Sequence, residues 1–383
     1  MRVLIFGSGL MAKPIAYDLI RQEDVERVYL IDVNARRLKE LRRWLNSPKV
    51  KVYQMDATDK RILPLLGECG VAISCVPYEY NLKLTRLAIA AKTNFCDLGG
   101  NNTIVRRQLA LSPLAEEAGI TVIPDCGLAP GMTNILAADG FNRLDKTEAV
   151  HIRVGGLPRN PKPPFFYRLL FSGQGLLNEY AEPCLILRDG RVKRVKPLTE
   201  PEEISFPKPF SQLEAFHTSG GSSTLPETFQ GKVKSLDYKT IRYPFHRVIF
   251  QLLLKAAVGD WQRYPRAILG YALEKTLGFE TDDVVLLRVD VMGKKGKERK
   301  MVRYQLIDYA DSKIGLTAMM RTTGFSAAIV ALMLAREEIE AKGVLPQERV
   351  INTSLFINEI KRRGLKLTIR SRSAPFAKKL VLY

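Results

Sequence analysis

The sequence of 383 residues is poor in the side chains that most often bind metal ions or build disulfide frameworks, with five cysteines and three histidines. The cysteines form no Cys-x-x-Cys pair and no Cys/His spacing typical of zinc, so we predict no metal site. A chain of this length is too large for a disulfide scaffold. We therefore expect reduced cysteines and a cytoplasmic protein.

Long apolar runs are also scarce. The longest uncharged one, GFSAAIVALMLA at 324–335, is shorter than the roughly 18 residues that a membrane span needs. The first residues, MRVLIFG, have the pattern of a β-strand rather than that of a signal peptide. We expect no association with a membrane.

Acidic residues are in deficit, since 40 Asp and Glu stand against 59 Lys and Arg and the formal net charge is +19. Two segments are strongly basic: KKGKERK at 294–300, which we interpret as a hairpin tip, and a tail from Lys361 to Tyr383. A basic balance attracts polyanions. Neither segment has the interleaved aromatic residues that stack on bases, so a nucleic-acid partner is not expected. A nucleic-acid-associated protein that keeps a nucleotide-binding fold stays an alternative.

Short apolar runs alternate with helical patterns over the first third of the chain. Strands are expected at 2–6, 28–32, 51–56, 70–76, 94–98 and 120–125. Strands joined by helical crossovers form a parallel sheet that is covered on both faces. The fold class predicted for this part is therefore α/β, a Rossmann-type doubly wound sheet over residues 1–130.

After residue 130 the pattern changes to longer alternating runs, which predict an inserted α+β domain with a largely antiparallel sheet over 131–320. Residues 321–383 are expected to return to the first domain as helices followed by the basic tail. Their first helix is predicted to begin at Thr322 or Thr323 and to stop at Gly343. The segment LEAFHTSGGSSTL, residues 213–225, shows no helix or strand pattern and is interpreted as a loop that carries binding groups.

The segment LIFGSGLMAKP has a Gly-x-Gly-x-x-Ala pattern at Gly7, Gly9 and Ala12, between the first strand and the first helix. Such a loop binds the pyrophosphate of a dinucleotide at the helix N-terminus. Asp32, at the end of the second strand, is placed to accept hydrogen bonds from ribose hydroxyls, which favours NAD, while the neighbouring Arg36 and Arg37 leave NADP as an alternative. The residues expected to contact the cofactor are Gly7, Ser8, Gly9, Leu10, Met11, Asp32, Asp56, Ala57, Cys75, Val76 and Pro77.

Two acids and three thiols follow the later strands: Asp97 and Asp125, with Cys75, Cys96 and Cys126. In open α/β sheets, ligands bind outside the carboxyl ends of the strands. The cysteines are interpreted as small buried side chains. For the two aspartates, a catalytic role and helix capping are equally compatible with the sequence.

Five segments occur in an order that resembles the lysine 6-dehydrogenase branch of the saccharopine dehydrogenase family: FGSGLMAK, FCDLGG, VIPDCGLAPGM, LEAFHTSGGSSTL and LDYKTIRYPFH. The likeness extends to about residue 365, and it departs from the family pattern where Phe245 replaces a glycine before His246. The resemblance implies a homodimeric enzyme that uses NAD to oxidise the ε-amino carbon of lysine. Ammonia and a 6-semialdehyde that closes to piperideine-6-carboxylate are the implied products.

The same resemblance implies the roles of the remaining candidates. A general base must take a proton from the ε-ammonium group, and Asp97, Asp125 and His217 are the candidates for it. Arg242 is suited to a substrate carboxylate, and the other expected substrate contacts are Tyr78, Gly99 and Thr218. The closest alternative is a saccharopine-type dehydrogenase, which needs further cations for a second dicarboxylic portion, and Arg153, Arg159 and Arg168 are available for these.

Overall fold

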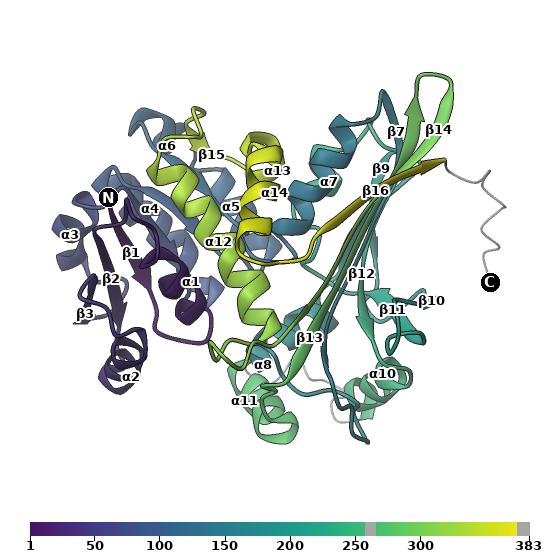
Figure 1. The fold of residues 1–383 in the computed structure, drawn as a ribbon, viewed down its shortest axis with the longest axis horizontal. Helices are drawn as coiled ribbons and strands as arrows, with labels where there is room; N and C mark the ends of the chain where they lie inside the picture. Colours follow the sequence, from purple (N-terminus) through teal and green to yellow (C-terminus); the bar gives the residue numbers. More distant parts are fainter. Residues whose placement is uncertain (257–265, 374–383) are drawn as a thin grey trace.

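The computed structural model describes residues 1–256 and 266–373 and contains two sheets with helices between them (Figure 1). The first sheet is entirely parallel, with the strand order β15-β6-β5-β4-β1-β2-β3. Its strands are β1 (Arg2–Phe6), β2 (Arg27–Asp32), β3 (Val50–Gln54), β4 (Val71–Ser74), β5 (Asn94–Asp97), β6 (Thr121–Ile123) and β15 (Gly343–Val344). The six predicted strands are therefore confirmed, and the predicted Rossmann-type fold with them.

Helices cover both faces of this sheet, as its crossovers require. In the first domain they are α1 (Ala12–Leu19), α2 (Ala35–Leu45), η1 (Lys60–Ile62), α3 (Leu63–Gly67), η2 (Tyr78–Tyr80), α4 (Asn81–Ala91), α5 (Asn102–Leu109) and α6 (Ser112–Glu117). The apolar faces of these helices and the strand side chains form two buried clusters, one on each face.

The second sheet has nine strands and is largely antiparallel, as predicted; β7 with β12 is its parallel pair among the described residues. Its strands are β7 (Lys146–Pro158), β8 (Cys184–Arg188), β9 (Arg191–Val195), β10 (Glu202–Ile204), β11 (Leu213–His217), β12 (Ser235–Arg242), β13 (Asp283–Lys295), β14 (Glu298–Tyr309) and β16 (Thr368–Ser373). The helices from residue 131 onward are α7 (Met132–Asn142), α8 (Gly173–Ala181), α9 (Leu225–Thr228), α10 (His246–Ala256), α11 (Arg266–Leu277), α12 (Ala318–Ala335), α13 (Gln347–Val350) and α14 (Thr353–Arg362). The KKGKERK segment forms the predicted hairpin tip, between β13 and β14.

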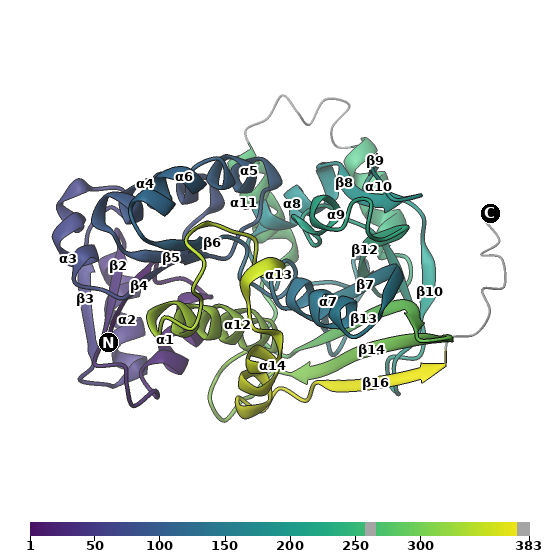
Figure 2. The same ribbon diagram turned by 90° about the horizontal axis from the view of Figure 1, so that it is seen from above.

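Helix α12 ties the two domains together. It packs against α1, β4 and β5 of the first domain and against β13 of the second (Figure 2). It is the one helix of the described chain that is long and apolar enough to cross a membrane, but 89% of that window is buried inside the protein. Its predicted bounds were wrong, because Thr317 caps the helix by accepting from the Met320 N–H, and the helix ends at Ala335.

One further expectation needs correction. The first five residues of LEAFHTSGGSSTL are not loop but the strand β11, which pairs with β10 and β12. Part of the basic tail, for which the sequence made no prediction, forms the strand β16, which pairs with β14 at the edge of the second sheet. Residues 374–383 lie outside the described residues.

Candidate functional site

The glycine loop after β1 has the geometry that its sequence predicts. Gly7 has a φ of +103°, and a Cβ on it would come within 3.0 Å of the Cys75 carbonyl oxygen. A Cβ on Gly9, by contrast, would meet no protein atom within 4 Å. The backbone at Gly9 is therefore open on the side where a pyrophosphate would approach, and Ala12 is buried at the start of α1.

Asp32 lies beside this loop at the carboxyl end of β2. Its Oδ2 accepts hydrogen bonds from the backbone N–H and the hydroxyl of Ser8, both at 2.7 Å, and its Oδ1 accepts from the Asn34 N–H at 2.8 Å. The carboxylate is thus fixed next to the pyrophosphate loop while remaining partly exposed. This arrangement fits the ribose of a dinucleotide.

The other predicted cofactor contacts divide into two groups. Cys75 and Val76 adjoin Gly7, and Pro77 follows them. Leu10 is exposed at the end of the glycine loop, and Met11 beside it is half-buried. Asp56 instead accepts hydrogen bonds from the N–H and the hydroxyl of Thr58, both at 2.7 Å, so it stabilises the turn that contains Ala57.

Asp97 and Asp125 meet at the carboxyl ends of β5 and β6. Asp97 is fully buried, and both of its oxygens are occupied: Oδ1 accepts from the Gly99 and Asp125 N–H groups, and Oδ2 accepts from Gln108 Nε2 at 2.7 Å. Burial raises the pKa of Asp97, and the Gln108 hydrogen bond opposes that rise. Asp97 therefore holds two loops in place, which differs from helix capping, one of the two roles that the sequence left open.

Asp125 has the more reactive environment. Its backbone φ is +65°, a left-handed value that costs energy for a residue with a side chain and that concentrates at functional sites. Burial, and then the charge of Asp97, raise the pKa of Asp125 to about 8. Tyr78 packs over Gly100 beside it, so the structure brings four predicted residues, Tyr78, Asp97, Gly99 and Asp125, to one corner.

The second domain and helix α13 complete this corner through residues that the sequence did not single out. Ser223, from the loop after β11, donates a hydrogen bond to Asp125 Oδ2. Gln347 Nε2 donates to the Asp125 carbonyl oxygen at 2.9 Å, and Glu348 accepts from the hydroxyls of Thr224 and Thr228. The hydroxyl-rich segment was a signal for Ser223, but nothing near Gln347 in the sequence pointed to this site.

His217 and Thr218 form their hydrogen bonds with residues other than the two aspartates. The two ring nitrogens of His217 face the Tyr238 carbonyl oxygen and Glu200 Oε2, each at 3.2 Å, and burial lowers the pKa of the ring. The Thr218 hydroxyl bonds to the Thr240 hydroxyl. Both residues anchor the end of β11.

Arg242 is buried in a cluster of aromatic side chains. Its guanidinium lies over the ring of Tyr167 at 4.5 Å, and its Nε donates to the Tyr180 hydroxyl at 3.0 Å. Its nearest charged partner is Glu179, with 3.7 Å between Arg242 NH2 and Glu179 Oε2. The same Tyr180 hydroxyl also forms a hydrogen bond with Nε2 of His246, at 2.8 Å.

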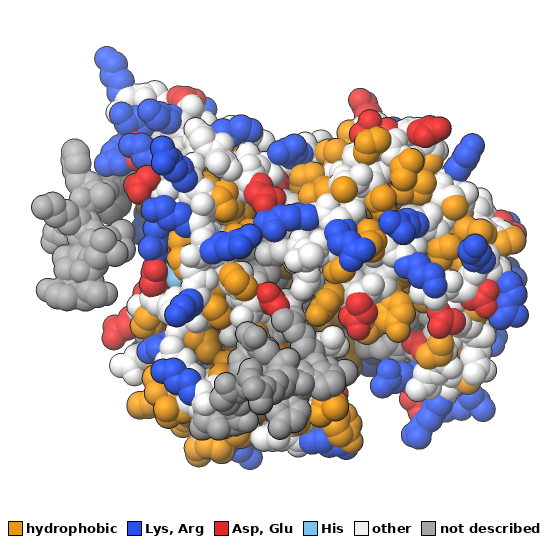
Figure 3. Space-filling view, turned by 180° about the vertical axis from the view of Figure 1, so that it is seen from behind, with side chains coloured by type: hydrophobic (Ala, Val, Ile, Leu, Met, Phe, Trp, Pro, Cys, Tyr) orange, Lys and Arg blue, Asp and Glu red, His pale blue; other side chains and the backbone are white. Residues whose placement is uncertain are grey.

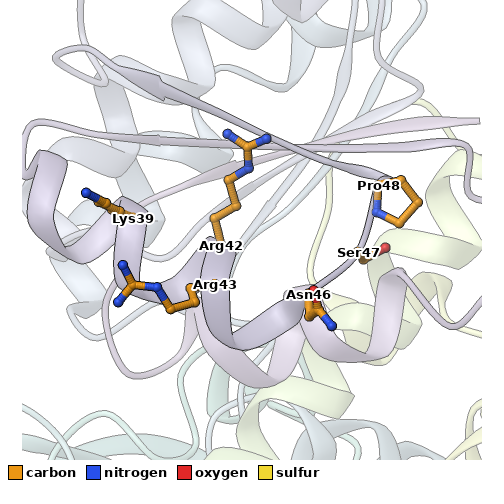
Figure 4. A pocket seen from close by; sticks show the side chains of 6 residues that line it. All are labelled: Lys39, Arg42, Arg43, Asn46, Ser47 and Pro48. Carbon is orange, nitrogen blue, oxygen red and sulfur yellow. The ribbon is translucent and has the colours of Figure 1, made fainter.

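A basic hollow of about 400 Å³ lies elsewhere, lined by Lys39, Arg42, Arg43, Asn46, Ser47 and Pro48 (Figure 4). It sits at the C-terminal end of α2, on the side of the sheet where the strands begin, so it is opposite the glycine loop. Its basic side chains point apart (Figure 4). On the face seen in Figure 3, Lys and Arg are spread among acidic and apolar residues rather than gathered into one strip.

The fold, the glycine loop and the corner that holds Asp97 and Asp125 define a two-domain protein with a pyridine-nucleotide-binding domain. Residues 3–123 match the saccharopine dehydrogenase NADP binding domain, and residues 127–365 match the saccharopine dehydrogenase C-terminal domain. The chain belongs to the saccharopine dehydrogenase family. The predicted family is confirmed, and the lysine 6-dehydrogenase branch stays a prediction.

Individual relatives are more distant. The chain is 27% identical over 200 residues to the NADP(+), L-glutamate-forming saccharopine dehydrogenase of Saccharomyces cerevisiae, an alignment covering 50% of this chain and 43% of that protein. It is 26% identical over 200 residues to the mitochondrial alpha-aminoadipic semialdehyde synthase of Bos taurus, covering 50% of this chain and 21% of that one. The chain thus matches less than half the length of these relatives.

Two solved structures share the fold. Apo saccharopine dehydrogenase (L-Glu forming) from Saccharomyces cerevisiae superposes with a TM-score of 0.77 at 20% identity, covering 97% of this chain and 100% of that one. Homospermidine synthase from Legionella pneumophila, in complex with NAD, gives 0.70 at 14% identity, covering 98% and 92%. At these identities the likeness shows the fold alone.

Proposed function

We propose that the protein is an oxidoreductase acting on CH–NH groups, and that it converts the ε-amino carbon of L-lysine to the 6-semialdehyde with release of ammonia. The aldehyde then closes to piperideine-6-carboxylate. The bound nicotinamide ring supplies the hydride acceptor. Loss of the hydride leaves an imine, and one water molecule must then add to it to give the aldehyde and ammonia. The tasks of the protein are therefore to bind the amine, to remove its proton and to admit this water.

The observation that carries this proposal is the buried carboxylate of Asp125, held between two domains with a pKa of about 8. An ammonium group has no free electron pair until it loses a proton, and a general base works best when its pKa lies near the working pH. Asp97 is less suited to this task because three protein donors occupy its two oxygens, whereas Asp125 accepts from the Ser223 hydroxyl and the Gly100 backbone. We therefore assign the role of base to Asp125.

The substrate preference rests on the arginines. A saccharopine-type substrate carries a second dicarboxylic portion, for which Arg153, Arg159 and Arg168 were the candidates. Arg153 is engaged with Glu202 and Asp237, and Arg159 pairs with Asp282 at 3.0 Å. Arg168 is exposed beside Gly278. The ion pairs of the first two arginines support a substrate with a single carboxylate, such as lysine, while Arg168 keeps the saccharopine-type alternative in the test.

For the cofactor, the position of Asp32 favours NAD over NADP, because its charge repels a 2′-phosphate. Arg36 does not oppose this, since it pairs with Glu40 at 2.8 Å on the exposed face of α2. The family model for this domain is nevertheless described by NADP, so both cofactors belong in the test.

The test is to follow reduced cofactor with lysine and with saccharopine at alkaline pH, each with NAD and with NADP. We expect turnover with lysine and NAD. Turnover with saccharopine and none with lysine would replace this proposal by the saccharopine-type alternative, and a preference for NADP would overturn the assignment of Asp32.

A further inference from the structure

Glu179, on α8, is a carboxylate with an unused acceptor in the second domain. Its Oε2 is buried and has no hydrogen-bond partner among the residues that the structure describes. The side chain as a whole still keeps 24% of its surface exposed, so part of it reaches the surface of the protein. A buried polar atom without a partner costs free energy unless a ligand or a water satisfies it.

The charge of Glu179 is balanced by the buried guanidinium of Arg242. Only 3% of Arg242 is exposed, and its NH2 lies 3.7 Å from Glu179 Oε2, which is too long for a hydrogen bond. The guanidinium is itself held by Tyr180 and by the Ile241 carbonyl oxygen. The guanidinium is therefore held in place, and the carboxylate is the member of the pair with an oxygen that has no hydrogen-bond donor among the described residues.

This pair lies close to the corner that holds Asp125. Asn178, the residue before Glu179, donates from Nδ2 to the Gly100 carbonyl oxygen at 2.7 Å. Gly100 in turn supplies a backbone hydrogen bond to Asp125. From the other side, Ser219, in the loop that contains Ser223, donates its N–H to the Glu179 carbonyl oxygen at 2.9 Å. These two hydrogen bonds link Asn178 and Glu179 to the loop that contacts Asp125 and to the loop that carries Ser223.

We propose that Glu179 binds the α-ammonium group of the substrate, with Arg242 as the residue that positions it, so that the site selects amines carrying a free α-amino-acid end. This rests on the proposed function, in which the other nitrogen of the same molecule meets Asp125. An ammonium group supplies the donor that Glu179 Oε2 lacks, and the adjoining α-carboxylate would meet the positive charge of Arg242, whose NH2 lies 3.7 Å from that oxygen. A substrate nitrogen at each end explains why one site holds two separate buried carboxylates.

The test compares L-lysine with 6-aminohexanoate, which is lysine without its α-amino group, in the wild type and in E179Q. We expect the wild type to prefer lysine by at least about tenfold in kcat/KM, the loss that follows when a charged hydrogen bond has no partner. E179Q should lower kcat/KM for lysine at least about tenfold while changing that for 6-aminohexanoate less than about threefold. E179D, which keeps the charge, should restore part of the preference.

E203Q is a matched control, because Glu203 is an exposed carboxylate in β10 of the same domain. An equal loss for both substrates in E179Q, or no preference in the wild type, would overturn the proposal and leave Glu179 a structural residue. Dissociation constants from calorimetry on the protein with NAD give an answer without turnover. If no amine is oxidised, the proposed function fails; if lysine still binds more weakly to E179Q than to the wild type and 6-aminohexanoate does not, the role of Glu179 stands.

Discussion

The Oδ1 atom of Asp125 occupies the space that a side chain at Gly99 would fill, because a Cβ built on Gly99 overlaps this oxygen. Gly99 also has a φ of +67°, which residues with a side chain rarely adopt. The two residues thus form one unit, in which the glycine permits the carboxylate to lie against the loop after β5. The conformation of Asp125 depends on this missing side chain.

Gly99→Ala is therefore expected to move the Asp125 carboxylate and lower kcat by about 100-fold or more, the typical contribution of a positioned base. Binding of the dinucleotide should change little, because the glycine loop is separate from Gly99. Steady-state kinetics and a fluorescence titration with NAD check the two halves. Gly119→Ala, at a similar φ of +71° but with no atom within 4 Å of its Cβ, is the control for backbone strain alone.

Asp125→Asn tests the base directly. Asparagine keeps the shape and the acceptor for Ser223 but cannot take a proton, so kcat should fall by about 10²–10⁴-fold. In the wild type, kcat should rise with pH up to about 8, since the carboxyl group must be ionised to act. A wild-type kcat that is flat between pH 6 and 9 would remove Asp125 from this role.

The same substitution should stabilise the protein in alkaline solution. The pKa of Asp125 is higher in the folded protein than the value of 3.8 for a free group, so the stability tied to its protonation is present below about pH 4 and is lost as the pH rises through 8. Asparagine does not ionise and avoids this loss. We expect a Tm at pH 9 higher than that of the wild type by at least about 2 °C, with a smaller difference at pH 5. A constant difference at both pH values would indicate a packing effect.

Ser223→Ala should raise the pKa of Asp125 further, because the hydroxyl donates to the ionised carboxylate and favours it. The rising limb of kcat should then move to higher pH by about one unit, while kcat at its plateau changes less. Ser222→Ala is the neighbouring control, since that hydroxyl bonds to the Leu185 carbonyl oxygen instead. A limb that moves equally in both variants would point to a general disturbance of the loop.

Much of this site could be predicted from local patterns. The glycine loop and Asp32 follow from spacing, and Asp97 and Asp125 follow from their places at the ends of strands, because the order of a parallel sheet fixes which edge is the binding edge. The contacts of Ser223, Gln347 and Glu179 could not be predicted this way. They depend on how the second domain and α13 fold back on the first, and that packing leaves no short-range pattern.

At Phe245 the sequence departs from the expected motif, yet the local backbone conformation is kept. The resemblance led us to expect a glycine before the histidine, and the backbone at this position would suit one, since Phe245 has a φ of +73° and is 70% exposed. The turn is kept in spite of the bulky side chain. Phe245→Gly should therefore raise the free energy of unfolding by about 1 kcal/mol through relief of strain, partly offset by the greater entropy of the unfolded glycine. Thermal unfolding checks this, and Phe245→Ala, which keeps the strain, should give no gain.

Gly9→Ala separates a cofactor contact from a structural one. A Cβ at Gly9 meets no protein atom within 4 Å, so the substitution should leave Tm unchanged to within about 2 °C. If the pyrophosphate lies against this backbone, the added methyl group should weaken NAD binding by about tenfold or more. Gly67→Ala, in α3 and away from the loop, is the matched control, with its Cβ 3.7 Å from the Ala91 carbonyl oxygen. Unchanged NAD affinity in Gly9→Ala would mean that the dinucleotide does not approach Gly9, and the assignment of this loop would have to be abandoned.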